Sequence, residues 1–173
     1  MDNRKKVPLK NKLAYGIGTG GGNVFSQIAA AFLLNYYTDT ALIGAGAIAT
    51  MFLVCRVFDG ITDLLMGGIV DKTSTKLGKA RPWLIASAPL SFLGIVLLMN
   101  VPMGLGENGK LVYAYITYIF MSCIVYTIYG ISNTALLPLM THDKDDSTML
   151  ATFSALGNNI IGLIAGSLIT PLV

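Results

Sequence analysis

Residues 51–67 read MFLVCRVFDGITDLLMG, an apolar run that nevertheless contains Arg56, Asp59 and Asp63. In a helix these three side chains lie on one face, with the two aspartates one turn apart. A charge at the centre of a bilayer costs roughly 2.5–3.5 kcal/mol, so such a cluster must be paired, face a wet cavity or hold an ion. Two ionised aspartates and one arginine leave a net negative charge that a monovalent cation would neutralise. The alternative is a structural ion pair that fixes this helix to its neighbours.

The composition places this stretch in a membrane protein. Of 173 residues, 54% are hydrophobic and only 12% are charged, whereas a soluble domain has about 25% charged residues. The net charge of +3 indicates no nucleic-acid partner, because the basic residues cluster by topology. Cys55 and Cys123 lie in apolar runs and predict neither a disulfide nor a metal site. The sequence therefore predicts an all-α membrane protein. Because no histidine or nucleophile accompanies the aspartates, we do not expect an enzyme.

Five apolar segments are long enough to cross a bilayer. They follow a polar head at residues 1–12 and cover about 13–37, 41–70, 83–101, 111–137 and 150–173. The head holds five basic residues and the loop after the second segment holds four, while the alternate loops hold only Lys110. Because cytoplasmic loops are enriched in Lys and Arg, we expect a cytoplasmic N-terminus. The polar segment at 141–148 matches no ion-binding loop and is expected to be a solvated connector.

Two further polar patterns lie inside the apolar segments. Asn23 and Gln27 are one helical turn apart, and they would either line a cavity or make an interhelical hydrogen bond. A stripe at spacings of three and four in the fourth segment consists of Tyr115, Tyr118, Ser122, Tyr126, Tyr129 and Asn133. Phenols and an amide would suit a wall that stacks on a solute and hydrogen-bonds its hydroxyls, and the alternative is a helix-packing face.

Small residues recur in the first and fifth segments. They are Gly16, Gly18, Gly20, Gly21 and Gly22 in the first, and Ser154, Asn158, Gly162, Gly166 and Thr170 in the fifth. Small residues let helices approach closely in a membrane, so both sets are expected to be packing seams.

Four short segments resemble the glycoside–pentoside–hexuronide:cation symporters. They are KLAYG at 12–16, YYTD at 36–39, RVFDGITD at 56–63 and GKARPW at 78–83. The resemblance runs from Lys12 to at least Pro138. It implies the major-facilitator fold, which has two six-helix bundles, alternating access and a central sugar site. This chain would then supply five helices of a truncated N-terminal six-helix bundle, and the missing C-terminal half is expected to be needed for transport.

The resemblance also implies a cation site at Asp59, Thr62, Asp63 and Thr127. Thr62 stands where melibiose permease has an amide. An all-oxygen site suits a hard cation such as Na⁺ or Li⁺, and an acidic pair could equally carry H⁺. No other cofactor is expected.

The substrate positions depart from melibiose permease. Where that transporter has two aspartates and an arginine, this chain has Asn23, Gly130 and Ala155. Loss of both carboxylates disfavours binding of galactosides whose hydroxyls would hydrogen-bond to them, and it favours a uronide or a substituted glycoside. The candidate substrate-binding residues are Asn23, Gln27, Arg56, Tyr126 and Tyr129.

The expected function is therefore part of a secondary transporter in the inner membrane, which moves a sugar or glycoside together with a cation. The chain ends inside an apolar segment, and we expect a fragment or a truncated copy. The alternative is a non-transporting membrane subunit in which Arg56, Asp59 and Asp63 form a structural ion-pair cluster.

Overall fold

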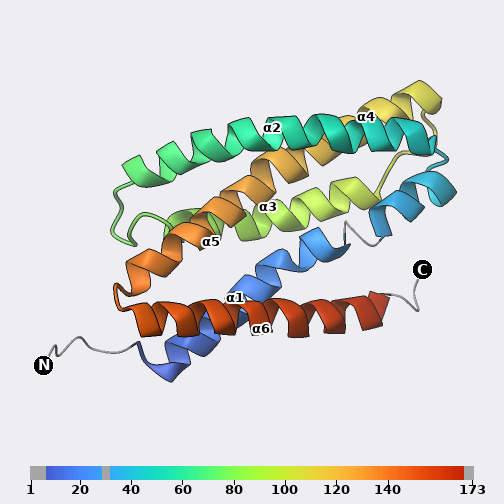
Figure 1. Cartoon of the computed structure of the whole chain (residues 1–173). Helices are drawn as coiled ribbons and strands as arrows, with labels where there is room; N and C mark the ends of the chain where they lie inside the picture. The colour runs from blue at the N-terminus through green and yellow to red at the C-terminus, as the bar shows by residue number, and fades with distance from the viewer. Residues whose placement is uncertain (1–6, 29–31, 170–173) are drawn as a thin grey trace, which may run out of the picture. The chain divides into compact units, whose positions relative to one another are not determined.

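The computed structural model describes residues 7–28 and 32–169 (Figure 1). These residues form helices and no strand, which confirms the all-α prediction for this part of the chain. The elements are α1 (Leu9–Ile28), the π-helix η2 (Tyr36–Thr40), α2 (Ala45–Lys72), α3 (Arg81–Met99), α4 (Glu107–Ile119), the π-helix η3 (Phe120–Tyr126), α5 (Thr127–Met140) and α6 (Lys144–Ile169). Parts of three predicted segments lie outside the described residues. They are three basic residues of the head, residues 29–31 of the first span and residues 170–173 of the fifth.

Three of the described helices are long and apolar enough to cross a membrane. They are Arg81–Met99, the continuous helix Glu107–Met140 and Lys144–Ser167. α1 and α2 are 20 and 28 residues long but are not among them. α1 is rich in glycine, and α2 carries the three charges of the 51–67 stretch. The structure therefore supports a membrane protein, but it does not confirm the predicted number of five spans.

The chain divides into two compact units. One contains α1, α6 and the chain from Asn133 onward, and the other covers residues 29–132. In the first unit α1 packs against α6 through glycines. A Cβ atom at Gly16 would collide with the Phe153 carbonyl group, and one at Gly20 would collide with the carbonyl group of Gly157. The expected close helix contact is thus confirmed for these glycines, because only a residue without a side chain allows the two backbones to approach this closely.

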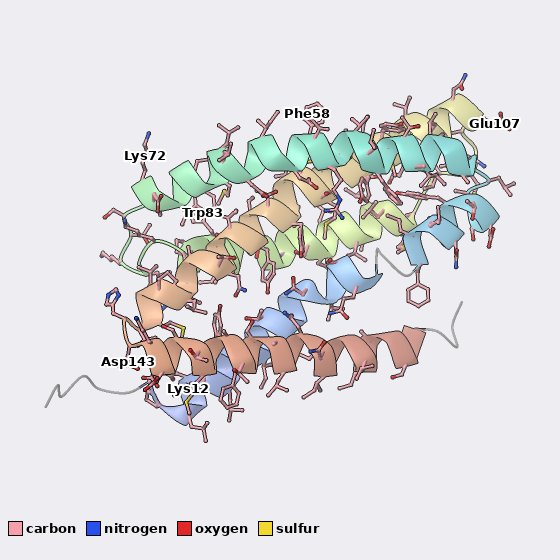
Figure 2. The ribbon with its side chains drawn as sticks, viewed as in Figure 1. Lys12, Phe58, Lys72, Trp83, Glu107 and Asp143 are labelled. Carbon is pink, nitrogen blue, oxygen red and sulfur yellow. The ribbon has the colours of Figure 1, made fainter. Side chains whose placement is uncertain are left out.

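The start of α6 is fixed by acidic side chains. Asp143 Oδ1 accepts hydrogen bonds from the N–H groups of Asp145 (2.9 Å) and Asp146 (3.1 Å), as an N-cap residue does. The Asp146 carboxylate accepts from Lys12 Nζ at 2.6 Å and from the Val7 N–H at 2.7 Å. The Lys12 and Asp146 side chains are only 8% and 5% exposed, and Figure 2 shows Lys12 beside Asp143 at this end of the unit. The prediction that 141–148 is simply a solvated connector is therefore wrong at Asp146.

In the second unit α2 runs alongside α4 and η3 in the same direction. The Tyr115 hydroxyl donates to the Ala47 carbonyl at 3.3 Å. Further along, the Phe52 and Tyr118 rings lie 5.0 Å apart between centroids. On the other side of this helix, a Cβ atom at Gly94 of α3 would collide with the Met121 sulfur. η3 is therefore held between α2 and α3.

The turn between α2 and α3 contains the GKARPW segment at 78–83. Gly78 has φ +92°, a left-handed conformation that glycine adopts without strain. Its N–H donates to the Thr75 carbonyl at 2.9 Å. The indole N–H of Trp83 donates to Thr73 Oγ1 at 3.0 Å, which ties the start of α3 to the end of α2.

Candidate functional site

Two carboxylate and hydroxyl contacts join α2 to the helix formed by η3 and α5. Ser122 Oγ donates to the Asp59 carboxylate, at 3.1 Å from Oδ1 and 3.3 Å from Oδ2. One turn further along α2, Thr62 Oγ1 lies 3.4 Å from Thr127 Oγ1. Asp59, Ser122 and Thr62 are half-buried and Thr127 is buried. These four side chains therefore place five oxygen atoms along one line of contact between two helices.

The hydroxyl groups are oriented by the backbone of α2. Thr62 Oγ1 lies 3.1 Å from the carbonyl oxygens of both Phe58 and Asp59, which accept its proton. In the contact between the Thr62 and Thr127 hydroxyls, either oxygen can be the donor. Figure 2 shows Phe58, the residue that precedes Asp59, midway along α2.

The π-helix η3 explains why Ser122 and Thr127 both reach α2. Residues five apart in a regular α-helix point about 140° away from each other, because each residue turns the chain by about 100°. A π-helix pairs residues i and i+5, so side chains with this spacing come close to one line. η3 covers Phe120–Tyr126 and Thr127 follows it directly. The π segment therefore brings both hydroxyls to the face of α2 that carries Asp59 and Thr62.

Arg56 and Asp63 are exposed on α2 and lie outside this set of contacts. Within the described part of the chain, the ion pair found is between Lys12 and Asp146, and Arg56 is paired with neither Asp59 nor Asp63. The structural ion-pair alternative therefore receives no support from the geometry.

Asn23 and Gln27 belong to the first unit, where both contact Asn158 of α6. Asn23 Nδ2 donates to Asn158 Oδ1 at 2.8 Å, and Gln27 Nε2 donates to the Asn158 carbonyl at 3.4 Å. A Cβ atom at Gly162 would collide with the Gln27 side chain. The interhelical hydrogen bond that the sequence left open is thus present.

The residues of the tyrosine stripe make contacts with different parts of the chain. Tyr115, Tyr118 and Ser122 contact α2, as described above. The Tyr126 and Tyr129 rings lie 6.4 Å apart between centroids, and Tyr129 is buried. Asn133 belongs to the first unit, where its carbonyl accepts from the Tyr15 hydroxyl at 3.3 Å. That the stripe forms one wall around a solute stays a prediction.

The described residues contain no ligand set for a transition metal, because no three His, Cys, Asp or Glu side chains come together among them. Carboxylate and hydroxyl oxygens suit a hard cation instead. The long apolar helices define an integral membrane protein. One of them, the helix that contains η3 and α5, carries these oxygens against α2, so a polar site lies between helices.

Comparison with known proteins identifies the family. The chain matches the family described as MFS/sugar transport protein over residues 14–173, so it belongs to a family of transporters and not of enzymes. It is 33% identical to the inner membrane symporter YicJ of Escherichia coli (strain K12), over 96% of this chain and 36% of that protein.

Two further relatives come from the same strain. The glucuronide carrier protein homolog is 33% identical over 96% of this chain and 36% of its own length. YagG, provisionally named a glycoside/cation symporter, is 37% identical over 86% of this chain and 32% of its own length. These names confirm the resemblance to glycoside:cation symporters. The chain spans about a third of the length of these relatives.

Proposed function

We propose that this chain is part of a symporter that moves a sugar or glycoside across the inner membrane together with a cation, by alternating access. The observation that carries the proposal is the line of oxygens from Asp59 and Ser122 to Thr62 and Thr127, within helices of a sugar-transport family. The relatives' names, which include an inner membrane symporter and a glycoside/cation symporter, support it. A second transmembrane half would complete the transporter, since the relatives are about three times as long, and the N-terminus would be cytoplasmic.

The proposed cation site consists of Asp59, Thr62, Asp63 and Thr127. Three of these four residues already contribute to the contacts between α2 and the η3–α5 helix. Asp63 lies one turn beyond Asp59 on α2 and is exposed, so a change of side-chain rotamer could bring it toward the same cation. Na⁺, Li⁺ and H⁺ are the candidates, because all three bind to oxygen donors.

The proposed substrate-binding residues are Asn23, Gln27, Arg56, Tyr126 and Tyr129. Arg56 is exposed and outside any ion pair in the described residues, so its guanidinium group is available to a solute carboxylate, which arginine binds in a bidentate manner. A uronide has such a carboxylate, and one relative is named a glucuronide carrier homolog. We therefore propose a uronide or a substituted glycoside as the solute.

Uptake by the complete transporter in proteoliposomes tests the proposal. Asp63→Asn should abolish cation-stimulated accumulation of a labelled glycoside while leaving some solute binding. Asp71→Asn is the matched control, because it removes the same charge from an exposed position at the end of α2. Accumulation against a gradient by the Asp63→Asn variant would refute a coupling role for Asp63.

A competition panel of melibiose, pentosides, uronides and neutral glycosides tests the solute class. We expect uronides or substituted glycosides to compete, and melibiose to compete weakly. Each charge-assisted hydrogen bond lost with the two absent carboxylates is worth roughly 1.5–3 kcal/mol. Tight binding of melibiose would show that other residues have replaced them.

A further inference from the structure

Ser122 makes its hydrogen bond across to a neighbouring helix, whereas hydroxyls such as those of Thr117 and Thr50 bond to the backbone of their own helix. Thr117 donates to the carbonyl of Tyr113 at 2.9 Å, and Thr50 donates to that of Gly46 at 2.9 Å. Such bonds to the preceding turn are the usual way in which a hydroxyl is satisfied inside a helix. Ser122 instead donates across to both oxygens of Asp59, at 3.1 and 3.3 Å. Its hydroxyl therefore serves the neighbouring carboxylate and not its own helix.

The surroundings keep this contact in place. Ser122 lies inside η3, between the buried residues Met121 and Cys123. The Cys123 thiol lies 3.8 Å from the Cys55 carbonyl oxygen, one turn before Asp59 on α2. Both neighbours of Ser122 are thus packed against other helices, which fixes the backbone position from which Ser122 reaches Asp59.

We propose that Ser122 is a further residue of the cation site, which positions the Asp59 carboxylate and supplies its own oxygen to a bound metal cation. This inference rests on the cation coupling proposed above. A hydroxyl has two lone pairs in addition to its proton, so Ser122 can donate to Asp59 and ligate a cation at the same time. Thr62 and Thr127, about one helical turn along the same contact, would supply further oxygens. Because selectivity among hard cations depends on ligand number and cavity size, Ser122 would set the preference between Na⁺ and Li⁺.

The test measures cation binding and transport by the complete protein. Binding is followed as the rise of the unfolding temperature with Na⁺ or Li⁺ concentration in detergent, because a ligand that binds the native state stabilises it. Transport is followed as cation-driven uptake in proteoliposomes. Ser122→Ala should raise the Na⁺ concentration for half-maximal effect by about tenfold or more, the value expected for loss of one hydrogen bond to a charged group. It should also change the ratio of Na⁺ to Li⁺ affinity.

Two matched variants separate positioning from packing. Ser122→Thr keeps the hydroxyl and should restore cation affinity. Ser132→Ala makes the same deletion further along this helix, where the buried hydroxyl has no hydrogen-bond partner among the described residues, and should leave both affinities unchanged. An unchanged Na⁺ affinity and Na⁺/Li⁺ ratio in Ser122→Ala, or an equal change in Ser132→Ala, would overturn the inference.

The two readouts also separate this inference from the proposed function. If the unmodified protein binds Na⁺ or Li⁺ but its uptake is independent of both, the proposed coupling fails while Ser122 is still judged by binding. If the unmodified protein binds neither cation, the inference about Ser122 fails, and the coupling proposal stands or falls on whether a proton gradient drives uptake.

Discussion

Breaking the Lys12–Asp146 pair should destabilise the contact between α1 and α6 strongly. The two side chains are 8% and 5% exposed and their charged atoms are 2.6 Å apart. Removing one partner of a buried ion pair costs about 3–5 kcal/mol, because the remaining charge stays buried without a counter-charge. Asp146→Leu leaves the Lys12 ammonium without its carboxylate and should lie at the upper end of this range. Lys12→Met should cost less, because the Asp146 carboxylate keeps the Val7 N–H at 2.7 Å.

The double variant distinguishes a true pair from two unrelated packing effects. Lys12→Met combined with Asp146→Leu removes both charges and replaces each side chain by an apolar one of similar length. Replacement of a whole buried pair by apolar residues is often neutral or stabilising. We therefore expect the double variant to be more stable than the Asp146→Leu variant, so that the two single effects do not add.

The assay is a double-mutant cycle on the free energy of unfolding of the complete transporter, measured by denaturant titration in mixed micelles. Lys144→Met is the control, because Lys144 is exposed at the start of α6 and its loss should change stability by at most about 0.5 kcal/mol. If the two single effects add within about 0.5 kcal/mol in the double variant, the side chains do not interact and the reasoning is refuted.

Three further predictions concern stability and use the same unfolding measurement. Gly16→Ala should destabilise the protein by about 1–3 kcal/mol, because the new methyl group would collide with the backbone of α6. The methyl group of Gly18→Ala would meet nothing within 4 Å, so this variant should stabilise the helix by about 0.5–1 kcal/mol. Equal effects of the two would contradict the glycine seam. Tyr36→Phe should cost about 1–3 kcal/mol by leaving the Met99 carbonyl, 2.7 Å from the hydroxyl, without its donor. Asp143→Ala should cost about 0.5–2 kcal/mol by removing the α6 cap, and no loss would mean that the cap contributes nothing.

Apolar length and turn residues predicted the helices of the third and fourth segments. The third predicted segment, 83–101, corresponds to α3 at Arg81–Met99, and the fourth, 111–137, lies within the continuous helix Glu107–Met140. Long apolar runs between polar turns leave little choice of secondary structure in a membrane, because backbone groups must bond within their own segment. Glycine-mediated packing of the first and fifth segments followed from the same logic.

The π-helix η3 could not be predicted from its residues. The run FMSCIVY at 120–126 contains neither glycine nor proline, and nothing in it distinguishes a π-helix from an α-helix. The extra residue in the turn is stabilised by packing against α2 and α3, which sequence periodicity cannot detect. The Lys12–Asp146 ion pair could not be predicted from the sequence for a similar reason. The two residues are 134 positions apart, and an exposed charged residue lies close to each in the sequence, Lys10 near Lys12 and Lys144 near Asp146.

The two helix contacts differ in how much movement they allow. Between α1 and α6 the backbones themselves touch at Gly16 and Gly157, so a shift of one helix would create a clash or open a gap. Between α2 and the η3–α5 helix the polar contact is made by side-chain ends, with Thr62 and Thr127 3.4 Å apart and Ser122 at 3.1 Å from Asp59. A hydroxyl moves between staggered rotamers by rotation about one bond. The hydroxyl groups between α2 and the η3–α5 helix can therefore reorient without a shift of either backbone, which the glycine contact does not permit.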